Sequence, residues 1–256
     1  MIVEVCANSF ESAKAAQDAG ADRIELCTEL SVGGLTPSFG LLEKVLVALT
    51  IPVHVLIRPR SGDFTYSEAE VDVMLRDIET CKELGCDGIV SGALTKDYEI
   101  DTGITERLIA ATGAMEFTFH RAFDWCSNAN RSLQVLKALG VTRLLSSGQQ
   151  PTAQEGMELL TTLQKDAGGV QIMPGGGINT TNCLQFKDAG FQMVHFSATK
   201  KIKTLATIPH IKMHSAKLFE EGVVTRSDKG TIREIIEKLP MDDLAVNDIL
   251  DVMAVL

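Results

Sequence analysis

Short stretches typical of β-strands alternate with stretches of helical periodicity along most of this 256-residue chain. Eight β-type stretches occur, at residues 2–6, 23–27, 52–57, 88–91, 116–119, 143–145, 170–173 and 193–196. The stretches between them place apolar residues at helical spacing, at residues 9–19, 38–49, 67–84, 104–112, 130–139, 152–166 and 180–189. Regular alternation of strands and helices is typical of a parallel sheet that helices cover.

A glycine ends several of the helical stretches immediately before the next strand. The four segments are Ala19-Gly20-Ala21-Asp22, Leu84-Gly85-Cys86-Asp87, Leu139-Gly140-Val141-Thr142 and Ala189-Gly190-Phe191-Gln192. Glycine adopts the left-handed conformation that ends a helix and returns the chain to the sheet. Eight such units follow one another without a linker, and the chain is close to the roughly 250 residues of one α/β barrel. This pattern predicts a closed TIM (β/α)8 barrel rather than an open doubly wound sheet.

The barrel is expected to occupy residues 1–240 as a single domain. Residues 199–230 have a less regular pattern, and residues 231–239 resemble a closing helix. Residues 241–256 form a C-terminal tail that is acidic and then apolar. This tail is predicted either to dock as a helix, on the barrel or on a partner subunit, or to be a frayed terminus.

Charge and composition exclude several classes of protein. The chain has 24 Lys and Arg against 34 Asp and Glu, a net charge of −10, which disfavours partners such as nucleic acid and acidic membrane surfaces. No apolar run reaches the 18 or more residues of a membrane span, and the first ten residues lack the pattern of a signal peptide. We therefore expect a cytoplasmic protein, whose six scattered cysteines are mostly reduced thiols.

The predicted strands carry polar side chains on the face that lines the barrel interior. Alternation places Glu4, Glu25 and His195 on that face. Buried charges cost several kcal/mol each unless they are paired, so such groups indicate either core ion pairs or chemistry. Because catalytic residues of this fold lie at the carboxyl ends of the strands, we predict a site at the barrel mouth. Its candidate catalytic residues are Glu25, Arg58, His120 and Asp124.

The first two strands repeat the pattern Glu-x-Cys, which ends at Cys6 and at Cys27. Neighbouring strands lie about 4.8 Å apart, so the two thiols are candidates for a shared metal site. Thiolates are soft ligands that suit Cu(I). The alternative is that both cysteines fill space in the core, as buried free cysteines commonly do.

Three loops after strands offer groups that bind anions, and one of them is the loop at residues 120–124 after the fifth strand, with an imidazole, a guanidinium and a carboxylate. Arg58 and Arg60 follow the third strand, and Gly175, Gly176 and Gly177 follow the seventh strand before a helical stretch. Backbone amides at such a turn can cradle a phosphate or carboxylate, although glycines also serve tight turns. The predicted ligand-binding residues are Arg60, Ser147, Gly175, Gly176, Gly177 and Ser197. The alternative for the charged loops is a set of salt bridges that hold the barrel rim.

Taken together, the motifs resemble those of the CutC family, which is associated with copper homeostasis. The matching stretches are EVC at 4–6, GADRIELC at 20–27, GGLTPS at 33–38, IRPR at 57–60, GDF at 62–64, TFHRAFD at 118–124, SSG at 146–148, MPGGGI at 173–178 and HFSA at 195–198. The resemblance implies a TIM barrel, a cytoplasmic location, a homodimer or higher homo-oligomer, and copper binding. Cys6 and Cys27 match the cysteines proposed in the family as Cu(I) ligands. The segments after residue 199 match none of these motifs.

Two main functional hypotheses follow from the sequence. The first is a copper homeostasis protein that binds Cu(I) through Cys6 and Cys27 without catalysis. The second is an enzyme acting on a small phosphorylated or carboxylated substrate, held by Arg58 and the glycine turn, with His120 and Glu25 moving protons. A third, structural hypothesis makes the barrel a scaffold whose tail recruits a partner.

Overall fold

The computed structural model describes residues 1–208, 210, 211, 213 and 221–239, and the tail predicted for residues 241–256 lies outside them. Eight parallel strands form one sheet with the neighbour order β7-β6-β5-β4-β3-β2-β1-β8. A parallel bridge between Gly175 and His195 joins the two ends of the sheet. The strands are β1 Ile2–Ala7, β2 Arg23–Leu26, β3 Val53–Leu56, β4 Gly88–Ser91, β5 Glu116–Phe119, β6 Arg143–Ser146, β7 Gln171–Pro174 and β8 Met193–Phe196. This topology confirms the predicted TIM barrel.

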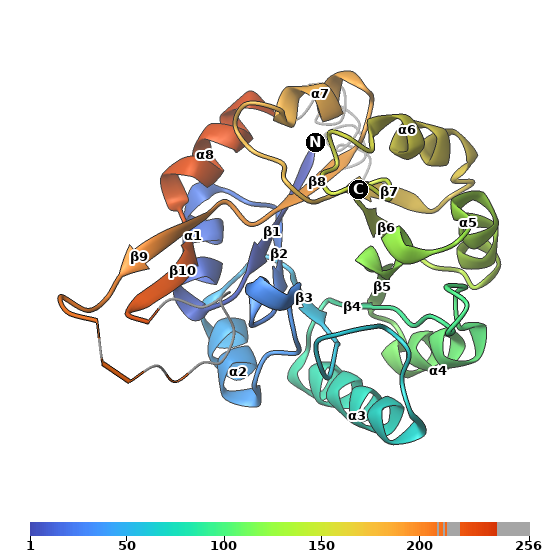
Figure 1. The fold of residues 1–256 in the computed structure, drawn as a ribbon, viewed down its shortest axis with the longest axis horizontal. Helices are drawn as coiled ribbons and strands as arrows, with labels where there is room; N and C mark the ends of the chain where they lie inside the picture. The colour runs from blue at the N-terminus through green and yellow to red at the C-terminus, as the bar shows by residue number, and fades with distance from the viewer. Residues whose placement is uncertain (209, 212, 214–220, 240–256) are drawn as a thin grey trace, which may run out of the picture.

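Helices surround the strands, as Figure 1 shows. They are α1 Phe10–Ala19, α2 Phe39–Ala48, α3 Glu68–Leu84, α4 Thr102–Thr112, α5 Ala129–Ala138, α6 Met157–Asp166, α7 Cys183–Asp188 and α8 Lys229–Lys238. Two short 3-10 helices, η1 Leu30–Val32 and η2 Arg121–Trp125, lie in the loops after β2 and β5. Helix α8 packs between α1 and α7 and completes the ring.

Local sequence signals explain where these helices begin and end. The hydroxyls of Ser9, Ser38 and Ser67 accept backbone N–H groups at the starts of α1, α2 and α3. The four glycines that the sequence placed at helix ends all have positive φ, namely Gly20 at 95°, Gly85 at 80°, Gly140 at 71° and Gly190 at 82°. The predicted glycine caps are therefore confirmed.

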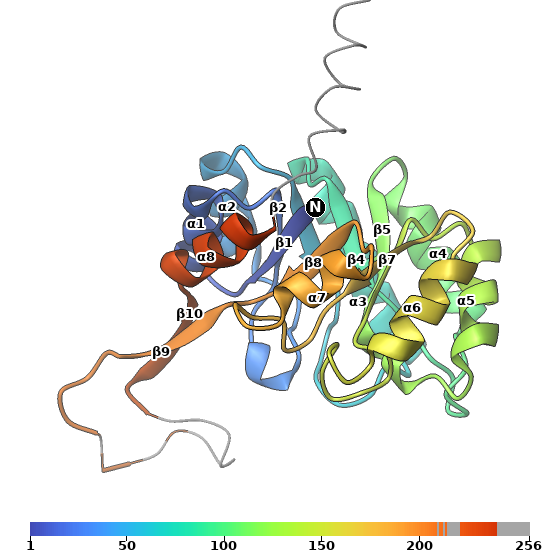
Figure 2. The ribbon, with the colours of Figure 1, turned by 90° about the horizontal axis from the view of Figure 1, so that it is seen from above.

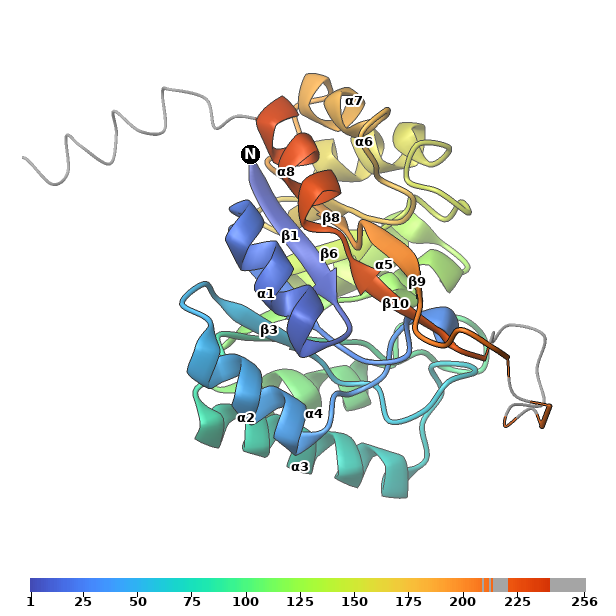
Figure 3. The same ribbon diagram turned by 90° about the vertical axis from the view of Figure 1, so that its left-hand side faces the viewer.

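Two segments differ most from the sequence-based expectation. Helix α6 begins at Met157 instead of residue 152, because Thr152 and Glu155 bond to each other in a turn ahead of it. Residues 199–230 contain an antiparallel hairpin, β9 Thr199–Lys203 paired with β10 Val223–Ser227. Figures 2 and 3 show the hairpin extending away from the barrel. Every β9 residue is exposed, so the strand lacks the alternation that would have predicted it.

The apolar core lies between the sheet and the helices. Val3, Val5, Ile24 and Leu26 are almost fully buried on the outward faces of β1 and β2, whereas the inward faces carry polar groups. None of the helices within the described ranges combines the length and hydropathy that crossing a bilayer requires.

Candidate functional site

A cavity of about 270 Å³ lies at the carboxyl ends of the barrel strands. Of the residues that the sequence predicted for the site, seven line this cavity: Cys6, Glu25, Arg58, His120, Gly176, Gly177 and Ser197. Arg121, His195 and Phe64 line it as well. Its position at the mouth is the place where this fold carries ligand sites.

Below the cavity, the barrel interior is organised around the fully buried carboxylate of Glu4. Arg23 Nε donates a hydrogen bond to Glu4 Oε2, and His195 Nδ1 lies 2.8 Å from Glu4 Oε1. His54 Nδ1 is 3.8 Å from the same carboxylate. Burial alone would raise the pKa of Glu4, but the hydrogen bond from His195 and the charge of Arg23 outweigh burial and lower that pKa far below its usual value. Glu4 is therefore a buried anion.

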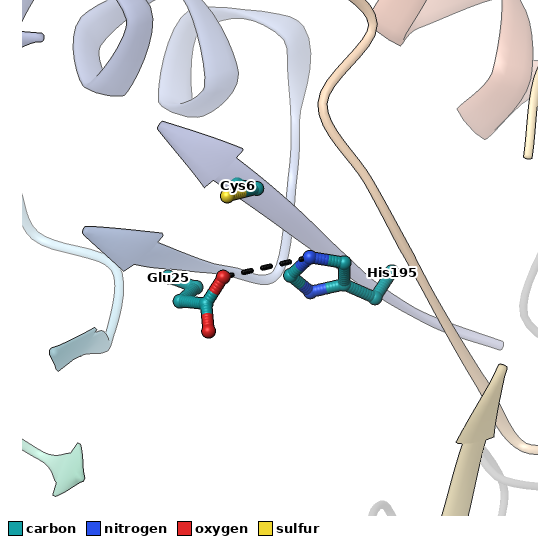
Figure 4. Close-up of side chains that lie close together, drawn as sticks. All are labelled: Cys6, Glu25 and His195. Carbon is teal, nitrogen blue, oxygen red and sulfur yellow. Dashed lines mark ion pairs between the residues drawn. The ribbon is translucent and has the colours of Figure 1, made fainter. Parts of the chain in front are cut away.

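At the cavity wall, Cys6, Glu25 and His195 form a cluster of three different donor atoms (Figure 4). One donor atom from each residue lies within 4.8 Å of the others, and His195 Nε2 is 3.5 Å from Glu25 Oε2. Burial raises the pKa of Glu25. Burial disfavours protonation of His195, but the charge of Glu25 and the hydrogen bond to Glu4 raise its pKa. When His195 is protonated, Glu25 and His195 form an ion pair.

His195 is a site residue that the sequence analysis placed inside the barrel but did not assign to the site. The sequence did contain a signal: His195 is two residues before the predicted site residue Ser197, so alternation places both side chains on the same face. The register pairs it with Glu4 on β1, and that pairing depends on how the last strand meets the first. The pairing of β8 with β1 therefore brings the imidazole to the Glu25 carboxylate.

The two cysteines predicted to share a metal are neighbours. Cys6 Sγ lies 3.5 Å from Cys27 Sγ. Cys27 is fully buried in a small apolar cluster with Cys6, Leu56 and Val90, and it does not line the cavity. The hydrogen bond with Cys27, together with burial, raises the pKa of the Cys6 thiol well above its usual value. The donor chemistry fits a soft cation such as Cu(I), and only Cys6 meets the cavity.

Arg58 follows β3 and lines the cavity, and hydrogen bonds to backbone carbonyls hold most of its guanidinium group. Its Nη1 donates to the carbonyl oxygens of Val32 at 2.7 Å and Gly34 at 3.1 Å, and its Nη2 donates to Gly62 at 3.2 Å. The ring of Phe64 lies 4.8 Å from Arg58 Cζ. The buried Nε atom has no partner in good hydrogen-bond geometry among the described residues, and the Tyr66 hydroxyl also interacts with this guanidinium.

His120 follows β5 and is only 5% exposed. Its Nδ1 accepts the backbone N–H of Ala122 at 3.3 Å, so the neutral ring carries its proton on Nε2. Burial, reinforced by the charge of Arg58, lowers the pKa of His120 to about 3. Nε2 is buried and unpartnered within the described part of the chain. His120 is thus a neutral hydrogen-bond donor on the cavity wall.

Asp124 and Ser147 lie beside the cavity. The Asp124 carboxylate accepts hydrogen bonds from Ser146 Oγ at 2.6 Å and from the Ser147 backbone N–H at 3.1 Å. Arg121 joins them, with Nε 2.7 Å from Asp124 and Nη2 2.7 Å from Ser147 Oγ. This network ties the loop after β5 to the loop after β6 and holds Arg121 at the cavity.

Arg60 and Gly175 do not line the cavity. Arg60 forms ion pairs with Glu70 and, at 3.1 Å, with Asp63, which matches the salt-bridged rim that was the alternative for this loop. Gly176 and Gly177 do line it, but helix α7 begins only at Cys183. The glycine turn is therefore separated from the helix that was expected to support it.

The fold and the site define the class of this protein: a TIM barrel with a polar, partly charged cavity at the carboxyl ends of its strands. A sequence profile of the CutC family matches residues 1–200. The chain is 46% identical over 197 residues to a CutC protein of Salmonella typhimurium, covering 77% of this chain and 79% of that protein. It is 43% identical over 242 residues to one of Pasteurella multocida, covering 92% and 97%. The chain belongs to the CutC family.

A solved structure agrees with this assignment. The crystal structure of a Streptococcus agalactiae CutC protein, named for copper homeostasis, superposes with a TM-score of 0.73 at 34% sequence identity. The match covers 77% of this chain and 98% of that protein. The predicted resemblance to the family is confirmed.

Proposed function

We propose that the mouth cavity binds a small molecule carrying a carboxylate or phosphate and acts on it as an enzyme. The observation that carries this proposal is the pair of unpartnered donors, His120 Nε2 and Arg58 Nε, in residues that line one cavity. A buried donor without a partner costs about 1–3 kcal/mol, and a ligand that supplies an acceptor oxygen removes that cost. Two such donors beside the charge of Arg58 favour an oxyanion.

The contacts refine the roles that the sequence suggested. Arg58 and Arg121 supply positive charge, and the neutral His120 donates to a carbonyl or phosphoryl oxygen and polarises it. Asp124 acts as a positioning residue through Arg121. Glu25 lies on the same cavity wall and stays a proposed catalytic group.

Other features that the family resemblance implies are also proposals. They are a cytoplasmic location and assembly into a homodimer or higher homo-oligomer. The single barrel domain over residues 1–240, which the strand and helix pattern predicts, is a proposal as well.

Replacing Arg58 with glutamine tests the anion site. We expect it to weaken binding of inorganic phosphate or acetate by about ten- to a hundredfold, because a hydrogen bond to a charged group contributes roughly 1.5–3 kcal/mol. Isothermal titration calorimetry measures the effect. Arg60→Gln is the matched control, since Arg60 lies on the same loop and does not line the cavity. Equal losses in both variants, or no binding by the wild type, would contradict the proposal.

A second candidate function is the binding of Cu(I) as cargo by Cys6 and Cys27. The separation of 3.5 Å between their sulfur atoms favours it. These thiolates would supply two soft ligands, and the apolar cluster around Cys27 would shield the ion from water.

Anaerobic competition with a calibrated chelator tests the copper candidate. We expect the Cys6→Ser/Cys27→Ser variant to lose tight Cu(I) binding, because hydroxyls are poor ligands for a soft cation. The matched control is Cys81→Ser/Cys86→Ser, which alters the other pair of buried neighbouring cysteines. Cu(I) affinity that survives the first substitution pair, or falls equally in both, rejects this candidate.

A further inference from the structure

We propose that Cys6, Glu25 and His195 form a mononuclear divalent-metal site whose best match is Zn²⁺. Each of the three residues is at least 92% buried, and one donor atom from each lies within 4.8 Å of the others. The three residues come from β1, β2 and β8 and line the same cavity (Figure 4). One sulfur, one oxygen and one nitrogen donor thus face a common space.

The contacts of His195 are those of a prepared metal ligand. Its Nδ1 is bonded to Glu4 Oε1 at 2.8 Å, which leaves Nε2 directed to Glu25. Metal-bound histidines usually donate their second ring N–H to a carboxylate, which fixes the tautomer and the ring orientation. Arg23 in turn holds the Glu4 carboxylate. The barrel interior therefore provides the support that such a ligand needs.

The donor set selects the cation. A mixed set of thiolate, imidazole and carboxylate suits Zn²⁺, whereas an all-oxygen set would suit Mg²⁺ or Ca²⁺. Three protein ligands would leave one tetrahedral position open, as in catalytic zinc sites, and all three residues line the cavity from which a substrate could fill it. Binding replaces the thiol proton of Cys6, which is released to solvent.

The metal site adds a cation to the cavity of the proposed enzyme. That the substrate is an oxyanion rests on the proposed function. Arg58 and His120 line the cavity that the three ligands share. The proposal therefore assigns one oxygen of the anion to the cation and the remaining oxygens to these donors. Glu25 then serves as a ligand of the cation instead of a proton carrier.

Zinc binding without substrate tests the inference. Competition with a chromophoric chelator under reducing conditions is expected to show one Zn²⁺ per wild-type chain, and Co²⁺ is expected to show thiolate charge-transfer absorption that disappears in Cys6→Ala. We expect Glu25→Gln and His195→Gln to weaken Zn²⁺ binding by about tenfold or more, as each removes one ligand. The control Cys27→Ala, which alters the neighbouring thiol, is expected to retain the wild-type affinity.

Thermal unfolding separates loss of a ligand from loss of the fold. Excess Zn²⁺ is expected to raise the melting temperature of the wild type clearly more than that of Glu25→Gln, which keeps the shape of the side chain. Equal loss of Zn²⁺ in Cys27→Ala overturns the assigned ligand set. If the wild type binds phosphate but not Zn²⁺, the proposed metal site is wrong and the proposed anion site stands. If the wild type binds Zn²⁺ but not phosphate, the metal site stands and phosphate is not its substrate.

Discussion

Replacing Glu4 with glutamine is expected to lower the free energy of unfolding by about 3–5 kcal/mol. Glu4 is fully buried and accepts from Arg23 and His195 at the same time. The amide of glutamine has one acceptor oxygen and one NH₂ group, so His195 keeps its bond only by accepting at Nδ1, as the neutral tautomer with the proton on Nε2. Removing the charge also leaves the buried guanidinium of Arg23 without its counter-ion. Urea unfolding followed by circular dichroism measures the change.

Glu116→Gln is the matched control for this prediction. Glu116 also bonds to a buried arginine, with its carboxylate 2.9 Å from Arg143 Nη2, but its side chain is 48% exposed. Water can reach the Glu116 side chain, and Arg143 keeps its hydrogen bonds to Thr118 Oγ1 and Gln171 Oε1, so we expect a clearly smaller effect. Adding Arg23→Met to Glu4→Gln is expected to restore part of the stability, since it removes the unpaired charge. Equal effects of Glu4→Gln and Glu116→Gln would refute the central role of Glu4.

Much of the barrel could be predicted because its local signals agree with one another. Glycines such as Gly20 and Gly85 mark the helix ends through a conformation that other residues rarely adopt. Side-chain alternation along β1 and β2 placed Glu4 and Glu25 inside, and both are buried there. These predictions depend only on the residues within one strand or one turn.

Features that depend on contacts between residues far apart in the sequence could not be predicted from the sequence. The bond between His195 and Glu4 joins residues 191 positions apart and requires the register of β8 on β1. The position of Cys27 behind Cys6, outside the cavity, also follows from packing against Leu56 and Val90. Alternation identifies the face of a side chain but does not show which groups on that face meet.

Replacing Gly148 with alanine is expected to lower the free energy of unfolding by about 3 kcal/mol, through a backbone collision in the loop between β6 and α6. Gly148 has a φ of 69°, and a Cβ atom there would lie 2.3 Å from the carbonyl oxygen of Gly156. Gly156 is itself packed against the Ser147 carbonyl oxygen, so neither side can yield easily. The displaced loop carries Ser147, which is bonded to Asp124 and Arg121. We therefore expect weaker phosphate binding together with the loss of stability.

Gly140→Ala distinguishes the collision from the cost of the backbone conformation alone. Gly140 has a φ of 71°, nearly the same as Gly148, but a Cβ atom there meets nothing within 4 Å. We expect this variant to lose only the roughly 1–2 kcal/mol of a left-handed alanine and to bind phosphate like the wild type. Urea unfolding and phosphate titration of both variants provide the comparison. If Gly148→Ala were as stable as Gly140→Ala, the close approach of Gly148 to Gly156 would not be what fixes this loop. The position of Arg121 at the cavity would then need another cause.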